Sequence, residues 1–383
     1  MSNIGRKRPA IVSIIELPRC FAGPPGVRLS GRSAAGRGKD ERHARDVFLM
    51  YYAGRQNMRI IHISEYKQDT MELAKPVYDG KRRILLAAGR SIHPMYIDRL
   101  KAMKISSLIV EDVESTGITL EEMMDMPTWM DAIEGVQQVF EGVASNKPFP
   151  VAVLQKAVRK LVMEVKSRRI IVLFPSSSLP EELFEYAHAV NVALLSLQIG
   201  KQMQYNDLQL HDLAVGCLLH DIGKLSAGDE KGHPEAGFAT LRKVREVNLV
   251  SAHVAYQHHE TLDGKGYPRG IAGKDFLEFA QVCGVANLFE NLVSRDNVPP
   301  HEAVERLMAM SGVAYLPSII DAFVRNVPSY PPGTKIKLRD GEAAIVTRIH
   351  THMQRPVIRL LSTNEEISLA DHPTVIVEGV FQA

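Results

Sequence analysis

An imidazole and a carboxylate stand side by side in an apolar stretch of this chain. Residues 216–224 read GCLLHDIGK, so a run of apolar side chains leads directly into His220 and Asp221. Such a run is expected to be buried. A buried carboxylate without a partner is unfavourable, so Asp221 must be matched by a cation, by hydrogen-bond donors or by a metal ion.

Histidines are concentrated around this pair. The chain has 14 histidines in 383 residues, and seven of them lie between 188 and 259: His188, His211, His220, His233, His253, His258 and His259. Imidazole is the commonest metal ligand near neutral pH. Most of the candidates lie at the ends of expected helices, where side chains from separate helices can converge. Adjacent helical residues point about 100° apart, so His258 and His259 can serve two neighbouring metal ions, or one ion and the partners of its ligands.

Two further features accompany the histidines. Residues 263–270 read DGKGYPRG, in which the glycines permit close backbone approach and Tyr267 offers an aromatic face and a hydroxyl. On this stretch alone, a rigid connecting loop is an equally good interpretation. Lys224 follows His220 by four residues, and it is either a phosphate-binding cation or a solvated lysine beyond a helix end.

The order of these residues resembles the HD-GYP family, a subgroup of the HD phosphohydrolases. His188 is followed 32 residues later by the HD pair and Lys224, then by His-Pro-x-x-Gly at His233 and by HHETLDGKGYPRG at 258–270. The resemblance covers about 175–330. It implies an all-helical domain that holds two, sometimes three, iron or manganese ions and cleaves cyclic di-GMP to the linear dinucleotide, and often on to GMP.

The resemblance also implies roles for individual residues. Asp221 would bridge the two ions and, with Lys224, act in catalysis. The implied metal ligands are His188, His220, Asp221, His233, His258, His259 and Asn287. The implied substrate-binding residues are Lys224, Asp263, Gly266, Tyr267, Pro268 and Arg295. The chemistry is consistent, because two ions about 3.5–4 Å apart can activate a water and clamp a phosphodiester, and a histidine-rich ligand set suits Fe, Mn or Zn better than Mg or Ca.

The chain departs from the family at several positions. Phe184 stands where a glutamate often supplies a third metal site, and Glu185 is one place away, so a two-metal site is predicted. Asn287 replaces an aspartate ligand and brings no negative charge, whereas Glu290 falls on the next aspartate of the motif. Arg295 is an approximate counterpart of the phosphate-binding arginine. We expect weaker metal binding from the loss of the aspartate.

These departures leave three functions open. The first is an active cyclic di-GMP phosphodiesterase. The second is a hydrolase of another phosphoester, such as a different cyclic dinucleotide. The third is a degenerate module that binds nucleotide or a signalling partner without turnover, and that passes a signal through the preceding domain. A helical protein with purely structural histidines explains the cluster poorly.

Composition and charge indicate the class of protein, its compartment and its expected partners. Apolar residues make up 45% and charged residues 23% of the chain, which is typical of soluble globular proteins. Cys20, Cys217 and Cys283 lie far apart, which fits a reducing compartment and predicts a cytoplasmic protein. No apolar run approaches the ~20 residues that span a bilayer. Residues 1–57 are basic but lack interleaved aromatic residues, so nucleic acid is not an expected partner.

The pattern along the chain predicts a mainly α protein in five parts: a disordered basic extension (1–57), a small α+β domain (58–115), a helical linker (116–147), an all-helical HD-GYP domain (148–327) and a short β appendage (328–383). Helices are expected over 120–143, broken at Pro127, and over 150–167, 180–204, 206–222, 233–244, 247–259, 276–293, 301–311 and 318–326. The apolar face of 120–143 suits either a homodimer contact or an intramolecular linker.

Overall fold

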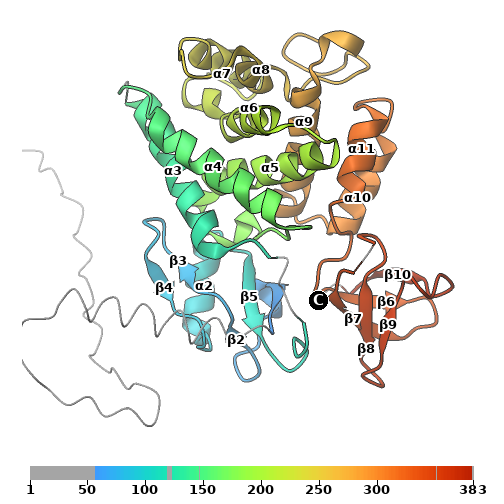
Figure 1. Ribbon diagram of the computed structural model, residues 1–383. Helices are drawn as coiled ribbons and strands as arrows, with labels where there is room; N and C mark the ends of the chain where they lie inside the picture. Colours follow the sequence, from blue (N-terminus) through green and yellow to red (C-terminus); the bar gives the residue numbers. More distant parts are fainter. Residues whose placement is uncertain (1–56, 119–122, 146, 351, 382–383) are drawn as a thin grey trace, which may run out of the picture. The chain divides into compact units, whose positions relative to one another are not determined.

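The computed structural model describes residues 57–118, 123–145, 147–350 and 352–381, all of which belong to one unit, Arg55–Ala383 (Figure 1). The extension predicted over 1–57 lies outside the described residues, apart from Asn57. Helices dominate the described chain, and short strands precede and follow them. The mainly α fold class is therefore confirmed.

The helical part is built around one long, buried helix. Its helices are α4 (Val151–Ser167), α5 (Glu181–Gln202), α6 (Asp207–Leu218), α7 (His233–Leu241), α8 (Leu249–Gln257), α9 (Glu278–Glu290), α10 (Pro300–Ala309) and α11 (Pro317–Val324). α5 contacts α4, α6, α9 and α11 (Figure 1). It is buried along most of its length from Ala187 to Gly200, because it is apolar on nearly every face and neighbours cover it all round.

Several helices end two to four residues earlier than the sequence pattern predicts, and histidine side chains explain the early ends of α6 and α8. The helix expected over 206–222 ends at Leu218, and a 3-10 turn follows over Ile222–Leu225. The ring of His220 donates from Nδ1 to the Cys217 carbonyl at 2.7 Å, which is the acceptor that a continuing helix would use. α8 ends at Gln257 in the same way, since His258 Nδ1 donates to the Ala255 carbonyl at 3.0 Å.

α3 (Met126–Ala144) begins later than the helix predicted from residue 120. Pro127 lies in its first turn, where a missing amide hydrogen is harmless, and Asp125 caps it by accepting from the Thr128 amide at 2.9 Å. The expected break at Pro127 is thus the start of the helix. α3 packs on α4 and α5, and the buried Trp129 donates from Nε1 to Asn191 Oδ1 at 2.9 Å, so this segment shares the core of the helical part.

Short strands form the remaining sheets. Near the start of the described chain, β1 (Arg59–His62), β5 (Ser107–Glu111) and β2 (Glu72–Leu73) form an antiparallel sheet in the order β1-β5-β2, with a hairpin of β3 (Val77–Tyr78) and β4 (Ile84–Leu86). α2 (Pro94–Ala102) packs with them around an apolar cluster that includes Ile61, Leu73 and Leu100. This arrangement agrees with the α+β composition predicted for the segment.

The last five strands form one antiparallel sheet. They are β6 (Lys335–Leu338), β7 (Ala343–Arg348), β8 (Val357–Leu360), β9 (Glu366–Ser368) and β10 (Val377–Val380), in the order β10-β6-β7-β8-β9. These strands lie within the β appendage predicted over 328–383, and β9, with the sequence Glu-Ile-Ser, is too short and polar to show a strand pattern by itself. No helix in the described part of the chain combines the length and the apolarity that crossing a bilayer would need.

Candidate metal centre

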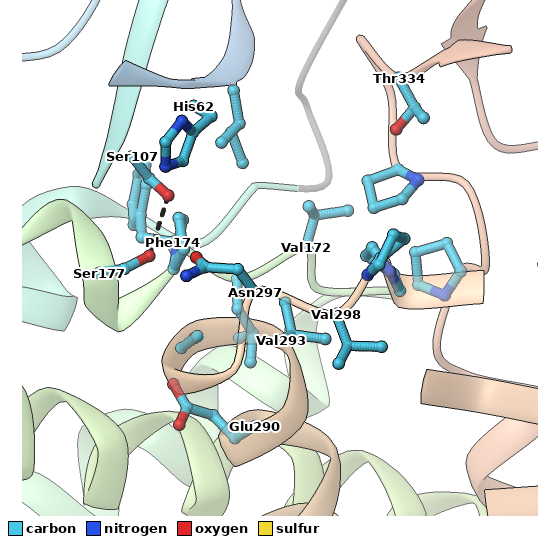
Figure 2. A pocket seen from close by; sticks show the side chains of 18 of the residues that line it. His62, Ser107, Val172, Phe174, Ser177, Glu290, Val293, Asn297, Val298 and Thr334 are labelled. Atoms are coloured by element: carbon cyan, nitrogen blue, oxygen red, sulfur yellow. Dashed lines mark hydrogen bonds between the residues drawn. The ribbon is translucent and has the colours of Figure 1, made fainter. Parts of the chain in front are cut away.

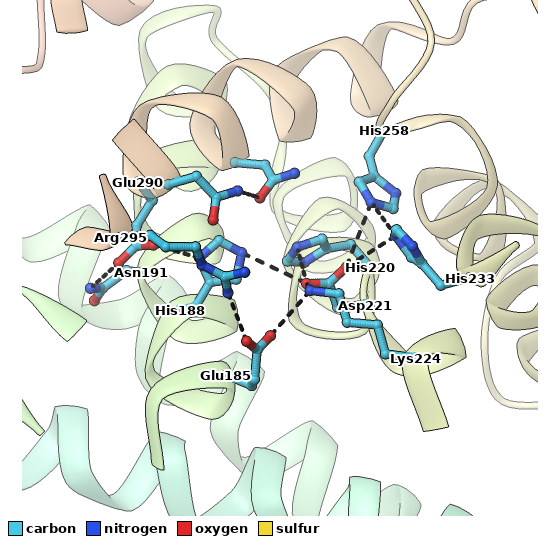
Figure 3. Close-up of polar contacts among 12 residues, drawn as sticks. Glu185, His188, Asn191, His220, Asp221, Lys224, His233, His258, Glu290 and Arg295 are labelled. Carbon is cyan, nitrogen blue, oxygen red and sulfur yellow. Dashed lines mark hydrogen bonds and ion pairs between the residues drawn. The ribbon is translucent and has the colours of Figure 1, made fainter. Parts of the chain in front are cut away.

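Asp221 lies at the centre of a histidine cluster, in the turn between α6 and the 3-10 turn. Its side chain is 5% exposed, and its two oxygens face different histidines (Figure 3). Oδ2 lies 3.3 Å from His220 Nε2 and 3.8 Å from His188 Nε2. Oδ1 lies 3.2 Å from His233 Nε2 and 3.8 Å from His258 Nε2. The carboxylate thus stands between two pairs of imidazoles.

The candidate ligand atoms fall into two groups. One group is His188, His220 and Asp221, and the other is His233, His258 and His259; within each, the ligand atoms lie within 4.8 Å of one another. The sequence left open whether His258 and His259 bind one metal ion or two neighbouring ions. The structure places both in the second group, with ring centroids 4.1 Å apart.

Hydrogen bonds fix the direction of each buried ring. Nδ1 of His220, His258 and His233 faces the backbone carbonyl of Cys217, Ala255 and Glu230, respectively. A carbonyl oxygen can only accept, so each Nδ1 carries a hydrogen and Nε2 is the nitrogen that can offer a lone pair to a metal ion. Each Nε2 faces Asp221. Metal-ligating histidines show this same pattern, in which the second ring nitrogen is anchored elsewhere.

The electrostatics of the cluster fit a metal ion. Nε2 of His188 and Nε2 of His220 are buried, and neither has a hydrogen-bond partner among the described residues. Burial and the neighbouring imidazoles lower the pKa of His258 well below its usual range and lower that of His259 to about 3, so both rings are neutral. Burial opposes the charge of Asp221, yet the nearby histidines and Lys224 hold its pKa well below the ordinary value. Burial lowers the pKa of His188, but Glu290 and Asp221 outweigh it and raise the pKa overall. Neutral imidazoles such as those of His258 and His259, beside an ionised carboxylate, suit Fe, Mn or Zn.

Gly223 lets the turn after Asp221 pack directly against α7. A Cβ at this position would lie 1.9 Å from the His233 carbonyl oxygen and 2.4 Å from the Gly237 amide nitrogen. Any larger residue would push the 3-10 turn away from α7. The glycine of the HDIGK stretch therefore keeps Asp221 close to His233.

The loop over 263–270 is held against the second histidine group. The ring of Tyr267 stacks on His259, with centroids 4.5 Å apart and an interplanar angle of 14°. A Cβ on Gly266 would lie 2.3 Å from the Glu260 Cα, so only glycine allows this approach. Burial, together with nearby carboxylates, raises the pKa of Tyr267 to about 12, which keeps its hydroxyl protonated.

Glu260 is a structural residue of the loop that the sequence analysis missed. Its side chain is completely buried and accepts from the amides of Arg269 at 2.8 Å and Ile271 at 3.2 Å. Asp263, predicted to bind substrate, accepts instead from Thr261 Oγ1 at 2.7 Å and pairs with Lys265 at 2.8 Å. Asp263 thus stabilises the conformation of the loop, and its contact with substrate remains a prediction. Pro268 follows Tyr267 in the same loop.

Two cations predicted to bind phosphate are joined by a carboxylate. Lys224 Nζ lies 2.6 Å from Asp221 Oδ2 and 3.1 Å from Glu185 Oε2, and Arg295 lies 2.7 Å from Glu185 Oε1 (Figure 3). Burial lowers the pKa of Lys224, but these carboxylates outweigh it and raise the pKa overall. The sequence marked Glu185 only as a displaced glutamate. The structure places it between Lys224 and Arg295.

α9 carries two more residues of interest. Asn287 is buried, and its Oδ1 accepts from Asn291 Nδ2 at 2.8 Å, so one lone pair of the predicted ligand atom is already used. Glu290 faces His188 Nδ1 at 2.5 Å and accepts from Ser176 Oγ at 2.5 Å. Burial would raise the pKa of Glu290, but His188 and the hydroxyl donors lower it to about 2. Glu290 is therefore an ionised partner of a candidate ligand, a role that its motif position did not suggest.

Comparisons with known proteins match the part of the chain that contains this site. The family model described as HD domain matches residues 176–319, a range that contains every predicted site residue. A cyclic di-GMP phosphodiesterase of Pseudomonas aeruginosa is 27% identical over 187 residues, which are 44% of this chain and 45% of that protein. A cyclic di-GMP phosphodiesterase of Thermotoga maritima is 29% identical over 161 residues, 37% and 44% of the two chains.

Further matches include a curated protein and a solved structure. A 3'3'-cGAMP-specific phosphodiesterase of Vibrio cholerae is 27% identical over 168 residues, 38% of this chain and 39% of that protein. The chain thus spans less than half the length of these curated relatives. Among solved structures, an HDG"Y"P protein from Bdellovibrio bacteriovorus matches with 19% identity and a TM-score of 0.44, over 70% of this chain and 98% of that one.

Proposed function

Because residues 176–319 form an HD domain related to those of cyclic di-GMP phosphodiesterases, we propose that the protein is a metal-dependent phosphodiesterase that hydrolyses cyclic di-GMP to the linear dinucleotide or to GMP. One observation carries the proposal. The buried carboxylate of Asp221 presents one oxygen to His188 and His220 and the other to His233 and His258. A carboxylate in that position can bridge two ions, as binuclear phosphodiester hydrolysis requires.

The residues of the chain divide into those that would hold metal and those that would hold substrate. The proposed ligands are His188, His220, Asp221, His233, His258 and His259, with Asn287 as a neutral contributor. Two transition-metal ions, Fe or Mn, would supply the activated water and neutralise the phosphate charge.

Lys224 is the cation nearest to the bridging carboxylate. Its raised pKa keeps it protonated, so it would bind and stabilise the phosphate rather than remove a proton. Arg295 would add a second positive charge once its contact with Glu185 is exchanged for phosphate. Tyr267 presents a flat ring over His259, and its outer face would stack on a guanine base.

The experiment combines metal analysis with turnover. Protein purified without oxygen should contain about two equivalents of Fe or Mn, the count of a binuclear site, and should convert cyclic di-GMP to pGpG or GMP in a chromatographic assay. Asp221→Asn should lose both metal and turnover. Asp275→Asn, an equal change at an exposed position of the domain, should retain both. Full metal content without conversion would contradict the proposal.

Asn287 supports a second candidate, a domain that binds a cyclic nucleotide without cleaving it. Its side chain is neutral where the family has an aspartate, and its carbonyl already accepts from Asn291. Tight binding of cyclic di-GMP with no product over hours would favour this candidate. Because one relative is named a 3'3'-cGAMP phosphodiesterase, the turnover assay should include that dinucleotide. Preferential cleavage of 3'3'-cGAMP would indicate the same hydrolytic reaction with a different substrate.

A further inference from the structure

A second cavity lies next to the end of α9, outside the histidine cluster. Its volume is about 490 Å³, which is within the range of ~300–1,000 Å³ that is usual for small-molecule sites. Its wall is mostly apolar, and Figure 2 shows valine side chains of α9's extension and of residue 172 turned toward it. The main apolar contributors are Val172, Phe174, Leu195, Phe289, Val293 and Val298.

A few polar groups gather on one side of this cavity. The hydroxyls of Ser107 and Ser177 lie 2.9 Å apart, and His62 and the Asn297 amide lie near them (Figure 2). These groups can both donate and accept hydrogen bonds. Glu290 also belongs to the lining, and its ionised carboxylate disfavours a negatively charged ligand beside it. The chemistry therefore suits a neutral, mostly apolar molecule with a hydrogen-bonding group at one end.

Glu290 connects this cavity to the candidate metal centre. Glu290 is one of the residues that line the cavity, its carboxylate faces His188 Nδ1 at 2.5 Å, and His188 Nε2 faces Asp221. Both side chains are almost completely buried, at 3% and 1% exposure. A change in the surroundings of Glu290 would thus reach a predicted metal ligand through a single hydrogen bond.

The backbone after Glu290 makes a second connection. α9 continues as a π-helical turn over Asn291–Arg295, and such turns are frequent at functional sites. Val293 and Ser294 of this turn line the cavity, whereas Arg295 pairs with Glu185 beside Lys224. One short turn therefore touches the cavity and also carries a cation predicted to bind phosphate.

We propose that this cavity is a regulatory site for a neutral, mostly apolar small molecule, coupled to the metal centre through Glu290. A ligand that fills the cavity packs against Val293 and Ser294 of the turn that follows Glu290, and so restrains the end of α9 from which Glu290 holds His188. His188 is then held more firmly and binds metal more tightly. This regulation does not depend on the proposed hydrolase activity, because it requires only that the His188 group binds a metal ion.

The first measurement tests the site. N-phenyl-1-naphthylamine, a neutral apolar dye that fluoresces in apolar surroundings, is titrated into the metal-loaded full-length protein. We expect saturable binding of one equivalent. Val298→Trp places a large side chain at a half-buried lining position and should weaken binding at least about tenfold. Val113→Trp, at a position that is 84% exposed and outside the cavity, should leave binding unchanged.

A second variant that fills the cavity is included in case Val298→Trp does not fold. Val293→Trp changes another half-buried lining residue, and circular dichroism identifies whichever variant keeps the native helix content. Absence of saturable dye binding, or equal binding by the folded filling variants and the Val113→Trp control, would overturn the site. The dye readout does not depend on hydrolysis, so this outcome is separate from failure of the proposed activity.

The second measurement tests the coupling. Mn²⁺ affinity of the apo protein is measured with and without saturating dye, and coupling predicts that the dye tightens Mn²⁺ binding by about fivefold or more. By linkage, Mn²⁺ must tighten dye binding by the same factor. Glu290→Gln should still bind the dye but lose this mutual effect. An unchanged Mn²⁺ affinity in the native protein, or equal coupling in Glu290→Gln, would overturn the route through Glu290.

Discussion

The contact between Glu290 and His188 permits a direct test of how the candidate metal centre is organised. Glu290 accepts from His188 Nδ1, Ser176 Oγ and Asn191 Nδ2, at 2.5, 2.5 and 3.3 Å. Glu290→Gln keeps the size of the side chain but replaces one acceptor oxygen by an NH₂ group. If that NH₂ faces His188, Nδ1 must accept, and the hydrogen moves to Nε2, where it blocks metal binding. If the amide is reversed, its NH₂ faces the Asn191 donor, and that bond is lost.

Either arrangement weakens the anchoring of His188, and the size of the effect can be estimated. Loss of a hydrogen bond to a charged group costs about 1.5–3 kcal/mol. Removing the partner of a metal-ligating histidine typically lowers metal affinity about 10–100-fold, equivalent to about 1.4–2.7 kcal/mol. We therefore expect Glu290→Gln to weaken Mn²⁺ binding at the His188 group by this factor, while binding at the His233 group changes little.

Titration of the apo protein with Mn²⁺, followed by the electron paramagnetic resonance of the free ion, resolves the two binding events. Glu302→Gln makes the same chemical change at a partly exposed position on α10 and should match the native protein. Urea unfolding confirms that the variants remain folded. Native Mn²⁺ affinity at both groups of a folded Glu290→Gln protein would refute the reasoning.

Three further outcomes are expected. Asn287→Asp adds a carboxylate where the family has one and should raise both metal content and turnover; an unchanged metal content would exclude Asn287 as a ligand. Gly223→Ala forces a Cβ into the His233 carbonyl and should lower the free energy of unfolding by about 1–3 kcal/mol, measured by urea denaturation. Tyr267→Phe retains the stacked ring and should retain the native KM, whereas Tyr267→Leu should raise KM for cyclic di-GMP; equal KM values would argue against base stacking.

Local sequence patterns were sufficient to predict the helices and the histidine cluster. The apolar period marks α4, α5 and α9 to within a few residues, because each must bury one or more faces in a common core. The ends of α6 and α8 were misplaced, since the His220 and His258 rings take carbonyls that a continuing helix would use. That competition depends on side-chain direction, which a periodic pattern does not contain.

The residues that support the site could not be identified from local patterns. Glu290 and His188 are 102 positions apart in sequence, and Glu185 meets Arg295 across 110 positions. Their pairing depends on how α5 packs against α9, and the individual positions show no pattern of their own. Glu260 was equally hidden, because an acidic residue beside a histidine pair suggests chemistry rather than a buried acceptor for backbone amides.

The two unusual residues on α9 are best understood together. Asn287 and Glu290 are three positions apart, so they lie on the same face of the helix. The family has an aspartate at both positions, whereas this chain keeps a carboxylate only at position 290, where Glu290 forms a hydrogen bond with His188. Glu290 is thus the one carboxylate of this pair that remains near the first ligand group.

The loss of one of the two carboxylates has a consequence for a double variant. If Glu290 compensates for Asn287, Asn287→Asp should restore most of the metal affinity that Glu290→Gln loses, because a new carboxylate ligand no longer requires the anchored His188. The two changes should then be strongly non-additive, as expected for residues that act on one site. The same Mn²⁺ titration gives the coupling energy. Additive effects of the two substitutions would show that positions 287 and 290 act independently, and that α9 does not compensate for its missing aspartate.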